Sequence, residues 1–146
     1  MAEAEWQAAL DEWAVRKVLD EYCLRLELDE FDRWLDLFTD DSIYEVYGMT
    51  LDGRDKVAEI LSKAPHGLHI GGPARITVDG DTAETVQSYA FVSTDSDDWN
   101  GGWYYRRLVR QGRAWKIAHT KVKFARKGTL PPVQGGRKPV YPITFS

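Results

Sequence analysis

Residues 69–93 read HIGGPARITVDGDTAETVQSYAFVS, and this stretch decides the fold because two strand-forming runs flank a tight turn. The turn is Asp-Gly-Asp at residues 79–81, and Asp-Gly between alternating apolar residues is a strong β-hairpin signal. Residues 103–124 repeat the arrangement around Gln-Gly-Arg at 111–113. The second half of the chain is therefore predicted to form an antiparallel sheet of two hairpins.

The first 63 residues are predicted to be mainly helical, with one strand. An apolar residue recurs at every fourth position, which predicts one long amphipathic helix over residues 3–27 that lies against a large apolar surface. We expect a second helix after Asp29 as N-cap, a strand over residues 42–49, and a short third helix over residues 54–63. The apolar stripe of the long helix consists of Trp6, Leu10, Ala14, Val18, Tyr22 and Leu26, widened by Trp13, Val15, Leu19 and Cys23.

Helices followed by antiparallel strands define an α+β protein with the order α-α-β-α-β-β-β-β. A strongly curved antiparallel sheet is expected to wrap around the long helix as a cone with an apolar interior. A chain of 146 residues fits one domain, placed at residues 1–125, and the Pro- and Gly-rich residues 126–146 are expected to form an extended arm. Strands that are apolar on both faces suggest that the outer face is buried in a homo-oligomer, a dimer or a trimer.

The composition indicates a cytoplasmic protein without a membrane partner. The longest apolar run is residues 89–92, far too short to cross a bilayer, and the acidic N-terminus lacks the features of a signal peptide. A single cysteine, Cys23, excludes an intramolecular disulfide, and it is interpreted as a small core residue.

The charge is distributed unevenly along the chain. The first 98 residues hold 23 acidic and 8 basic residues, whereas the last 48 hold 11 basic residues and no acidic ones. A basic tail that binds nucleic acid is one interpretation. The alternation of Arg and Lys with apolar residues in 103–124 favours the other, in which half-buried strands face an acidic helical layer or a second subunit. No nucleic-acid partner is therefore predicted.

No nucleotide, phosphate or serine-nucleophile motif is present, so cofactor-dependent and nucleophilic chemistry are not expected. His66 and His69 form His-x-x-His without a clear third ligand, so no metal site is predicted. The acidic loop at residues 94–102 does not fit calcium, because Trp99 occupies a ligand position and no glutamate follows at the required spacing.

Acid–base chemistry remains, and His69 is its best candidate because it opens a strand that should face the long helix. Glu27 ends the apolar helical stripe, where a buried carboxylate needs a partner. We expect a dyad in which Glu27 orients the His69 imidazole, which then takes a substrate proton. The alternatives are that His69 is a structural, hydrogen-bonded residue and that Glu27 extends into solvent.

Four tyrosines could bind the substrate through their hydroxyl groups in an apolar pocket: Tyr22, Tyr44, Tyr89 and Tyr104. Because of an extra residue in the turn after residue 110, the sequence does not decide which face of the strand over residues 103–110 points into the pocket. Either Trp103 and Tyr105 or Tyr104 and Arg106 point into the pocket. His119 is assigned to the surface or an interface.

The order of elements and several sequence stretches resemble the SnoaL-like polyketide-cyclase group of the nuclear-transport-factor-two-like superfamily. The stretches are residues 27–44, His-Ile-Gly-Gly at 69–72, residues 78–84 and residues 114–119, and the resemblance spans residues 8–125. It implies a cystatin-like α+β barrel. The resemblance indicates the reaction only weakly, since this fold hosts dehydratases, dehydrochlorinases, isomerases, epoxide hydrolases and binding proteins.

Within this group the layout is similar to the scytalone dehydratase and hexachlorocyclohexane dehydrochlorinase families. The resemblance places His69 at the catalytic histidine and Glu27 at the catalytic carboxylate, which is usually aspartate. Tyr44 matches an aromatic cavity position. Tyr22 and Thr120 replace a catalytic lysine and arginine of the dehydrochlorinase, and Tyr89 replaces a second histidine of scytalone dehydratase; these departures argue against either named reaction.

These patterns predict a cofactor-free lyase or isomerase, dehydratase-like or cyclase-like, that transfers a proton on a small apolar, cyclic, oxygenated substrate. The alternative is a non-catalytic protein that binds a small ligand or serves as an assembly subunit. Residues 31–46 favour that alternative, because they resemble the small subunit of ring-hydroxylating dioxygenases.

Overall fold

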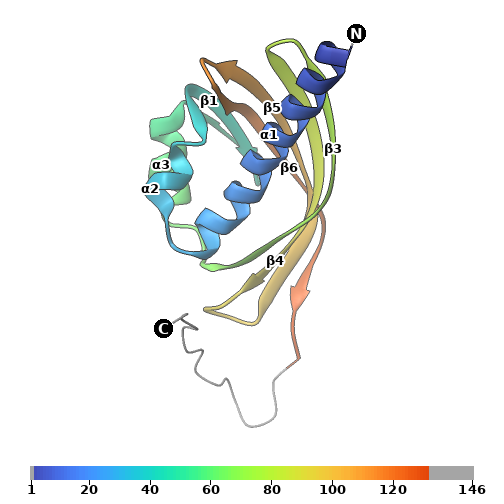
Figure 1. Cartoon of the computed structure of the whole chain (residues 1–146). Coiled ribbons are helices and arrows are strands. Elements are labelled where there is room, and N and C mark those ends of the chain that lie inside the picture. Colours follow the sequence, from blue (N-terminus) through green and yellow to red (C-terminus); the bar gives the residue numbers. More distant parts are fainter. Residues whose placement is uncertain (1, 132–146) are drawn as a thin grey trace, which may run out of the picture.

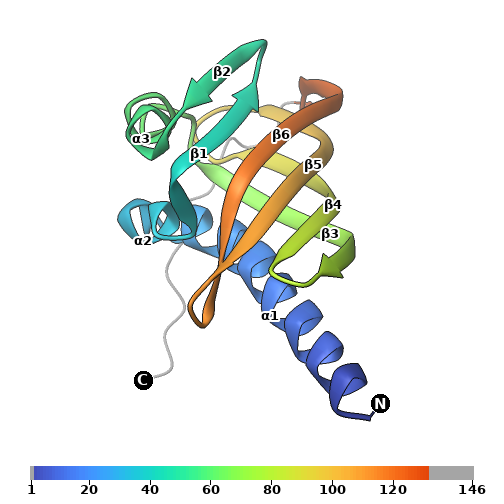
Figure 2. The same cartoon turned by 90° about the horizontal axis from the view of Figure 1, so that it is seen from above.

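The computed structural model describes residues 2–131, which form a curved sheet wrapped around a long helix (Figures 1 and 2). The predicted α+β class and the curved sheet are confirmed. The sheet order is β2-β1-β6-β5-β4-β3. The helices are α1 (Ala2–Glu27), α2 (Phe31–Leu35) and α3 (Arg54–Leu61), and the strands are β1 (Phe38–Val46), β2 (Met49–Asp52), β3 (Gly67–Asp79), β4 (Thr82–Ser93), β5 (Asp98–Gln111) and β6 (Ala114–Thr129).

The sheet is mixed rather than purely antiparallel, because β1 pairs with β6 in parallel. The short strand β2, absent from the predicted order, returns antiparallel to β1 through a turn at Tyr47 and Gly48, which both have positive φ angles of 53° and 72°. The second helix is shorter than expected, since Phe38 already belongs to β1.

The predicted arm at residues 126–146 begins too early. Strand β6 continues to Thr129, which pairs with Asp98 of β5, because main-chain pairing extends past the change in composition. The rest of that arm, residues 132–146, lies outside the described residues.

Helix α1 crosses the concave face of the sheet and buries Val15, Leu19 and Tyr22 there. The predicted stripe is not buried over its first half, where Trp6, Leu10 and Trp13 are 72%, 55% and 59% exposed. The start of the helix extends beyond the edge of the sheet (Figure 2). From Asp11 onwards the buried face consists of Asp11, Val15, Leu19, Tyr22 and Cys23, so Leu10 and Trp13 lie outside it.

Within residues 2–131, one ion pair joins the acidic helix to the basic strands. Arg110 of β5 contacts Asp11 of α1 at 2.8 Å and Asp81 of the β3–β4 turn at 3.0 Å. By contrast, Lys121 and Lys123 of β6 are exposed. Within the described part of the chain, no helix is both long and apolar enough to span a membrane.

Leu19→Ala should lower the free energy of unfolding by about 2–5 kcal/mol, because it removes a fully buried side chain and leaves a cavity under the sheet. Leu10→Ala, on the exposed part of the same helix, should change it by less than about 0.5 kcal/mol. Denaturant titration of the two variants measures the difference, and equal losses would contradict this packing of α1.

Candidate active site

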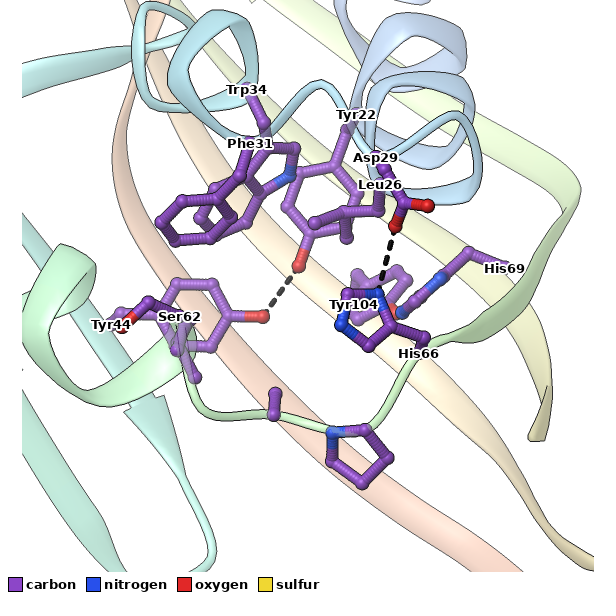
Figure 3. A pocket seen from close by; sticks show the side chains of 13 residues that line it. Tyr22, Leu26, Asp29, Phe31, Trp34, Tyr44, Ser62, His66, His69 and Tyr104 are labelled. Atoms are coloured by element: carbon purple, nitrogen blue, oxygen red, sulfur yellow. Dashed lines mark hydrogen bonds and ion pairs between the residues drawn. The ribbon is translucent and has the colours of Figure 1, made fainter. Parts of the chain in front are cut away.

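A cavity of about 230 Å³ lies where the C-terminal end of α1, helix α2 and the chain after α3 meet the concave face of the sheet (Figure 3). A wider and more open cavity of about 1010 Å³ adjoins it. The two cavities share Tyr44, His69, Tyr104 and the segment of Leu61, Ala64 and Pro65 as lining residues. We refer to the two adjoining cavities together as the hollow, with the smaller cavity as its inner part and the larger one as its outer part.

Two phenol groups meet in the inner part of this hollow. Tyr22 of α1 and Tyr44 of β1 place their hydroxyl oxygens 2.5 Å apart, and Figure 3 shows the pair among the lining side chains. Tyr104 of β5 lies edge-on to Tyr22, with ring centroids 5.2 Å apart. Burial raises the pKa of all three phenols, so each stays protonated and can donate a hydrogen bond at neutral pH.

His69 lines both parts of the hollow from the start of β3. Its ring packs against Phe91 at 4.9 Å between centroids, and its buried Nδ1 has no hydrogen-bond partner among residues 2–131. Burial lowers the pKa of the imidazole to about 4, against a smaller opposing effect of the Gly67 backbone. At neutral pH His69 is therefore an uncharged imidazole able to accept a proton.

The Glu27 carboxylate contacts the main chain of His69 and not its imidazole ring. Its Oε1 accepts a hydrogen bond of 2.8 Å from the His69 main-chain N–H, and no hydrogen bond joins it to the imidazole within the described residues. The physical reason is that β3 is an edge strand, so an N–H directed away from β4 needs an acceptor from outside the sheet. Glu27 does not line either cavity. The expected contact of Glu27 with the imidazole ring is not formed, and Glu27 contacts the His69 backbone instead.

A histidine–carboxylate pair does exist at the mouth of the inner cavity, between His66 Nδ1 and Asp29 Oδ1 at 2.8 Å (Figure 3). Both side chains are well exposed, at 64% and 71%. The sequence placed Asp29 as the N-cap of the second helix. Instead it follows α1 with a positive φ of 58°, and Glu30 occupies the cap position of α2.

The structure decides which face of β5 points inward. Tyr104 and Arg106 are buried, whereas Trp103 and Tyr105 are exposed. Tyr89 of β4 lies in the outer part of the hollow, stacks on Tyr104 at 4.2 Å and donates a hydrogen bond to Asn100 Oδ1. Of the six predicted site residues, five line the hollow: Tyr22, Tyr44, His69, Tyr89 and Tyr104. Glu27 does not line it and contacts the His69 main chain.

Arg106 is a buried charged residue next to the site that the sequence did not single out, and it lines neither cavity. Its guanidinium is buried between the rings of Tyr22 and Tyr104, with its carbon 4.1 Å and 4.2 Å from their centroids. Only the alternation of β5 pointed to it, as one of two possible inward residues. Among residues 2–131, no cluster of three or more His, Cys, Asp or Glu side chains is placed to hold a metal ion.

A curved α+β sheet with one helix across it and a lined hollow at one end defines a class of small single-domain proteins. The family model described as a SnoaL-like domain matches residues 7–121, so the chain belongs to this family. No curated protein matches the chain.

Solved structures share the fold at low sequence identity. A protein from Novosphingobium aromaticivorans assigned as a scytalone dehydratase has a TM-score of 0.74 at 16% identity, covering 90% of this chain and 93% of its own. A type 2 hexachlorocyclohexane dehydrochlorinase, LinA, has a TM-score of 0.79 at 12% identity, covering 92% and 97%. A protein from Novosphingobium aromaticivorans assigned as the β subunit of an aromatic-ring-hydroxylating dioxygenase has a TM-score of 0.67 at 26% identity, covering 86% and 94%.

The lowered pKa of His69 makes the folded protein sensitive to acid. The unfolded chain takes up a proton on this residue near pH 6.5 and the folded chain only near pH 4, so stability present above pH 6.5 falls through this window. The contribution lost is about 3 kcal/mol. Denaturant titrations at several pH values should show a smaller loss in His69→Phe, and an unchanged pH dependence in that variant would contradict the burial of a neutral imidazole.

Proposed function

We propose that this chain is a cofactor-free lyase or isomerase that moves a proton on a small, largely apolar, cyclic substrate bearing a carbonyl or hydroxyl group. The main support is the uncharged imidazole of His69, which lines the same hollow as the Tyr22–Tyr44 hydroxyl pair. The fold is shared with proteins assigned to elimination reactions, and the reaction proposed here uses only side chains of this chain.

The low pKa of His69 restricts the substrate. An imidazole with a pKa of about 4 is fully available as a base at neutral pH, but it is a weak base. It can remove a carbon-bound proton only where a neighbouring carbonyl makes that proton acidic. One of the two hydroxyls donates its proton within the Tyr22–Tyr44 hydrogen bond, so the other can donate a hydrogen bond to the carbonyl oxygen as negative charge develops on it.

Glu27 has a positioning role in this proposal. It fixes the main chain at the start of β3, and thereby the direction in which the His69 ring enters the hollow. This differs from a dyad, in which the charge of the carboxylate would stabilise the protonated imidazole directly.

An assembly or ligand-binding role is the second candidate. The structure assigned as a dioxygenase β subunit is, at 26%, more identical to this chain than the two assigned to elimination reactions. That role requires no proton transfer. A His69→Ala variant would then bind ligand as well as the wild type, and the chain would co-purify with a larger partner.

His69→Ala should slow proton exchange by roughly 10²–10⁴-fold, because a positioned base contributes about that much to a rate. A suitable probe is β-tetralone, a small cyclic ketone with acidic carbon-bound protons, and mass spectrometry measures its uptake of deuterium from heavy water. His66→Ala is the matched control, since His66 lines the same cavity but is exposed. Exchange at the wild-type rate in His69→Ala would remove the mechanism.

Replacement of Glu27 separates positioning from charge. Glu27→Gln keeps an oxygen that can accept from the His69 main-chain N–H, so its exchange rate should stay within a few fold of the wild type. Glu27→Ala removes the acceptor and should slow exchange by at least about tenfold, since displacement of a catalytic group by roughly 1 Å can cost about 10²-fold. Equal losses in both variants would favour a charged dyad instead.

A further inference from the structure

The start of helix α1, residues 2–13, exposes an apolar surface. Trp6, Leu10 and Trp13 follow the spacing i, i+4, i+7, so they lie on one side of the helix, and each is more than half exposed. Lys17 lies over the Trp13 ring at 4.6 Å and still leaves that ring open to solvent. Contiguous exposed apolar surface on a soluble protein marks an interaction site. The start of α1 is therefore a candidate surface for a partner.

The start of α1 is also acidic. Residues 2–13 hold four acidic residues and no basic one. Asp11 and Glu12 form ion pairs inside the chain. Glu3 and Glu5 form no ion pair with any of residues 2–131. Because Glu3 lies one turn before Trp6, its carboxylate borders the apolar surface. A partner for this surface needs an apolar groove with positive charge beside it.

The convex face of the sheet holds a groove of that kind. It has a volume of about 440 Å³ and lies between the turn that joins β1 to β2 and the strands β5 and β6. Tyr47 and Met49 line it from the turn, 68% and 42% exposed, and Tyr105 lines it from β5. Lys121, which pairs with Tyr105 in the sheet, and Lys123 line it from β6. The groove thus offers aromatic and aliphatic surface next to two ammonium groups.

The charge of the groove is only partly neutralised inside the chain. Lys121 Nζ is 3.7 Å from Glu45 Oε2, a carboxylate that His119 also contacts. Lys123 forms no ion pair within the described part of the chain, residues 2–131. The uneven distribution of charge along the sequence therefore leaves unpaired carboxylates at the start of α1 and an unpaired ammonium group in the groove.

The two surfaces cannot meet within one chain. Helix α1 lies against the concave face of the sheet, whereas Tyr105 and Lys123 are on the convex face, so the sheet separates them (Figures 1 and 2). The start of α1 reaches beyond the edge of the sheet, where another molecule can approach it. Glu45 in the groove disfavours a nucleic acid as the occupant, because its carboxylate repels phosphates. A second copy of the chain carries both complementary surfaces.

We propose that the start of α1 docks into the convex-face groove of a second copy of this chain. Trp6 and Trp13 are the apolar anchors, and the carboxylates that precede them lie beside Lys123. A helix that binds a groove through residues at i, i+4 and i+7 is a recurrent mode of recognition. Made in both directions, the contact gives a two-fold dimer; made in one direction, it gives a ring or an open chain of copies.

This association adds to the fold and does not complete it. Helix α1 is held by its own sheet through Val15, Leu19 and Tyr22, so the dilute chain stays folded as a monomer. None of the groove residues and none of residues 2–13 is assigned to proton transfer. Loss of association and loss of catalysis are therefore separate results.

Sedimentation velocity of the full chain at several concentrations measures the association. The wild type should sediment as more than one copy of 16.7 kDa and dissociate on dilution. Trp6→Ala combined with Trp13→Ala should raise the dissociation constant at least about tenfold, since buried tryptophans are among the strongest contributors to interfaces. Leu24→Ala combined with Leu28→Ala is the control, because both leucines are exposed apolar residues at the other end of α1. A wild type that is monomeric at every concentration, or a tryptophan variant that associates normally, would overturn the proposal.

A mixing experiment shows whether the two surfaces bind each other. Tyr105→Ala combined with Lys123→Glu impairs the groove and keeps the start of α1 intact, whereas the tryptophan variant keeps the groove intact. Each variant alone should associate weakly, and an equimolar mixture should associate more tightly than either. Circular dichroism checks that the variants are folded, and Lys123→Glu alone, at an exposed position, replaces the groove variant if Tyr105→Ala unfolds the chain. A mixture that associates no better than its components would refute the contact between helix and groove.

Discussion

Helix α1 fills only part of the concavity of the sheet, and the hollow exists because of this. Its middle residues Val15 and Leu19 are fully buried against the sheet and hold the two layers together. One turn later the same face presents Tyr22, and the sheet is closed there by α2 and the segment after α3 rather than by the helix. Trp34 of α2 packs on Tyr22 and on Phe38, with centroids 5.3 Å and 4.6 Å apart, so an aromatic wall replaces the aliphatic core at this end.

Local patterns of the sequence predict most of the fold and the identity of most lining residues. The period of four residues places Tyr22 on the apolar stripe of α1, and Tyr44, Tyr89 and Tyr104 lie on predicted strands, although the sequence left the inward face of the strand that holds Tyr104 undecided. Contacts that depend on main-chain geometry are not visible in such patterns. Strand β5 is shifted against β6 by bulges, one of them between Arg107 and Leu108, so the inward face cannot be counted from the turn. The contact of Glu27 with a main-chain N–H depends in the same way on β3 being an edge strand.

The inner end of the hollow is polar in a way that stability alone does not require. His69 Nδ1 and two nitrogens of Arg106 are buried without partners among residues 2–131. Each such group costs free energy that an apolar side chain of similar size would not, and native cores contain few of them. Both residues adjoin the Tyr22–Tyr44 pair, Arg106 by its contact with Tyr22 and His69 as a lining residue of the same cavity. These unpartnered atoms have almost no accessible surface and Arg106 lines neither cavity, so a ligand in the hollow would meet the Tyr22 and Tyr44 hydroxyls and the His69 ring instead.

The same polarity bears on which reaction this hollow can promote. Elimination requires a donor that protonates or stabilises the leaving group, and the phenols here have pKa values raised by burial, which makes them poor acids. An imidazole that has taken a proton, by contrast, is a strong acid when its pKa is about 4, and it returns that proton readily. Within the proposed function, the protonated His69 is therefore the acid that completes the reaction. It can return the proton to a different carbon, which is an isomerisation, or give it to a leaving group, which is an elimination.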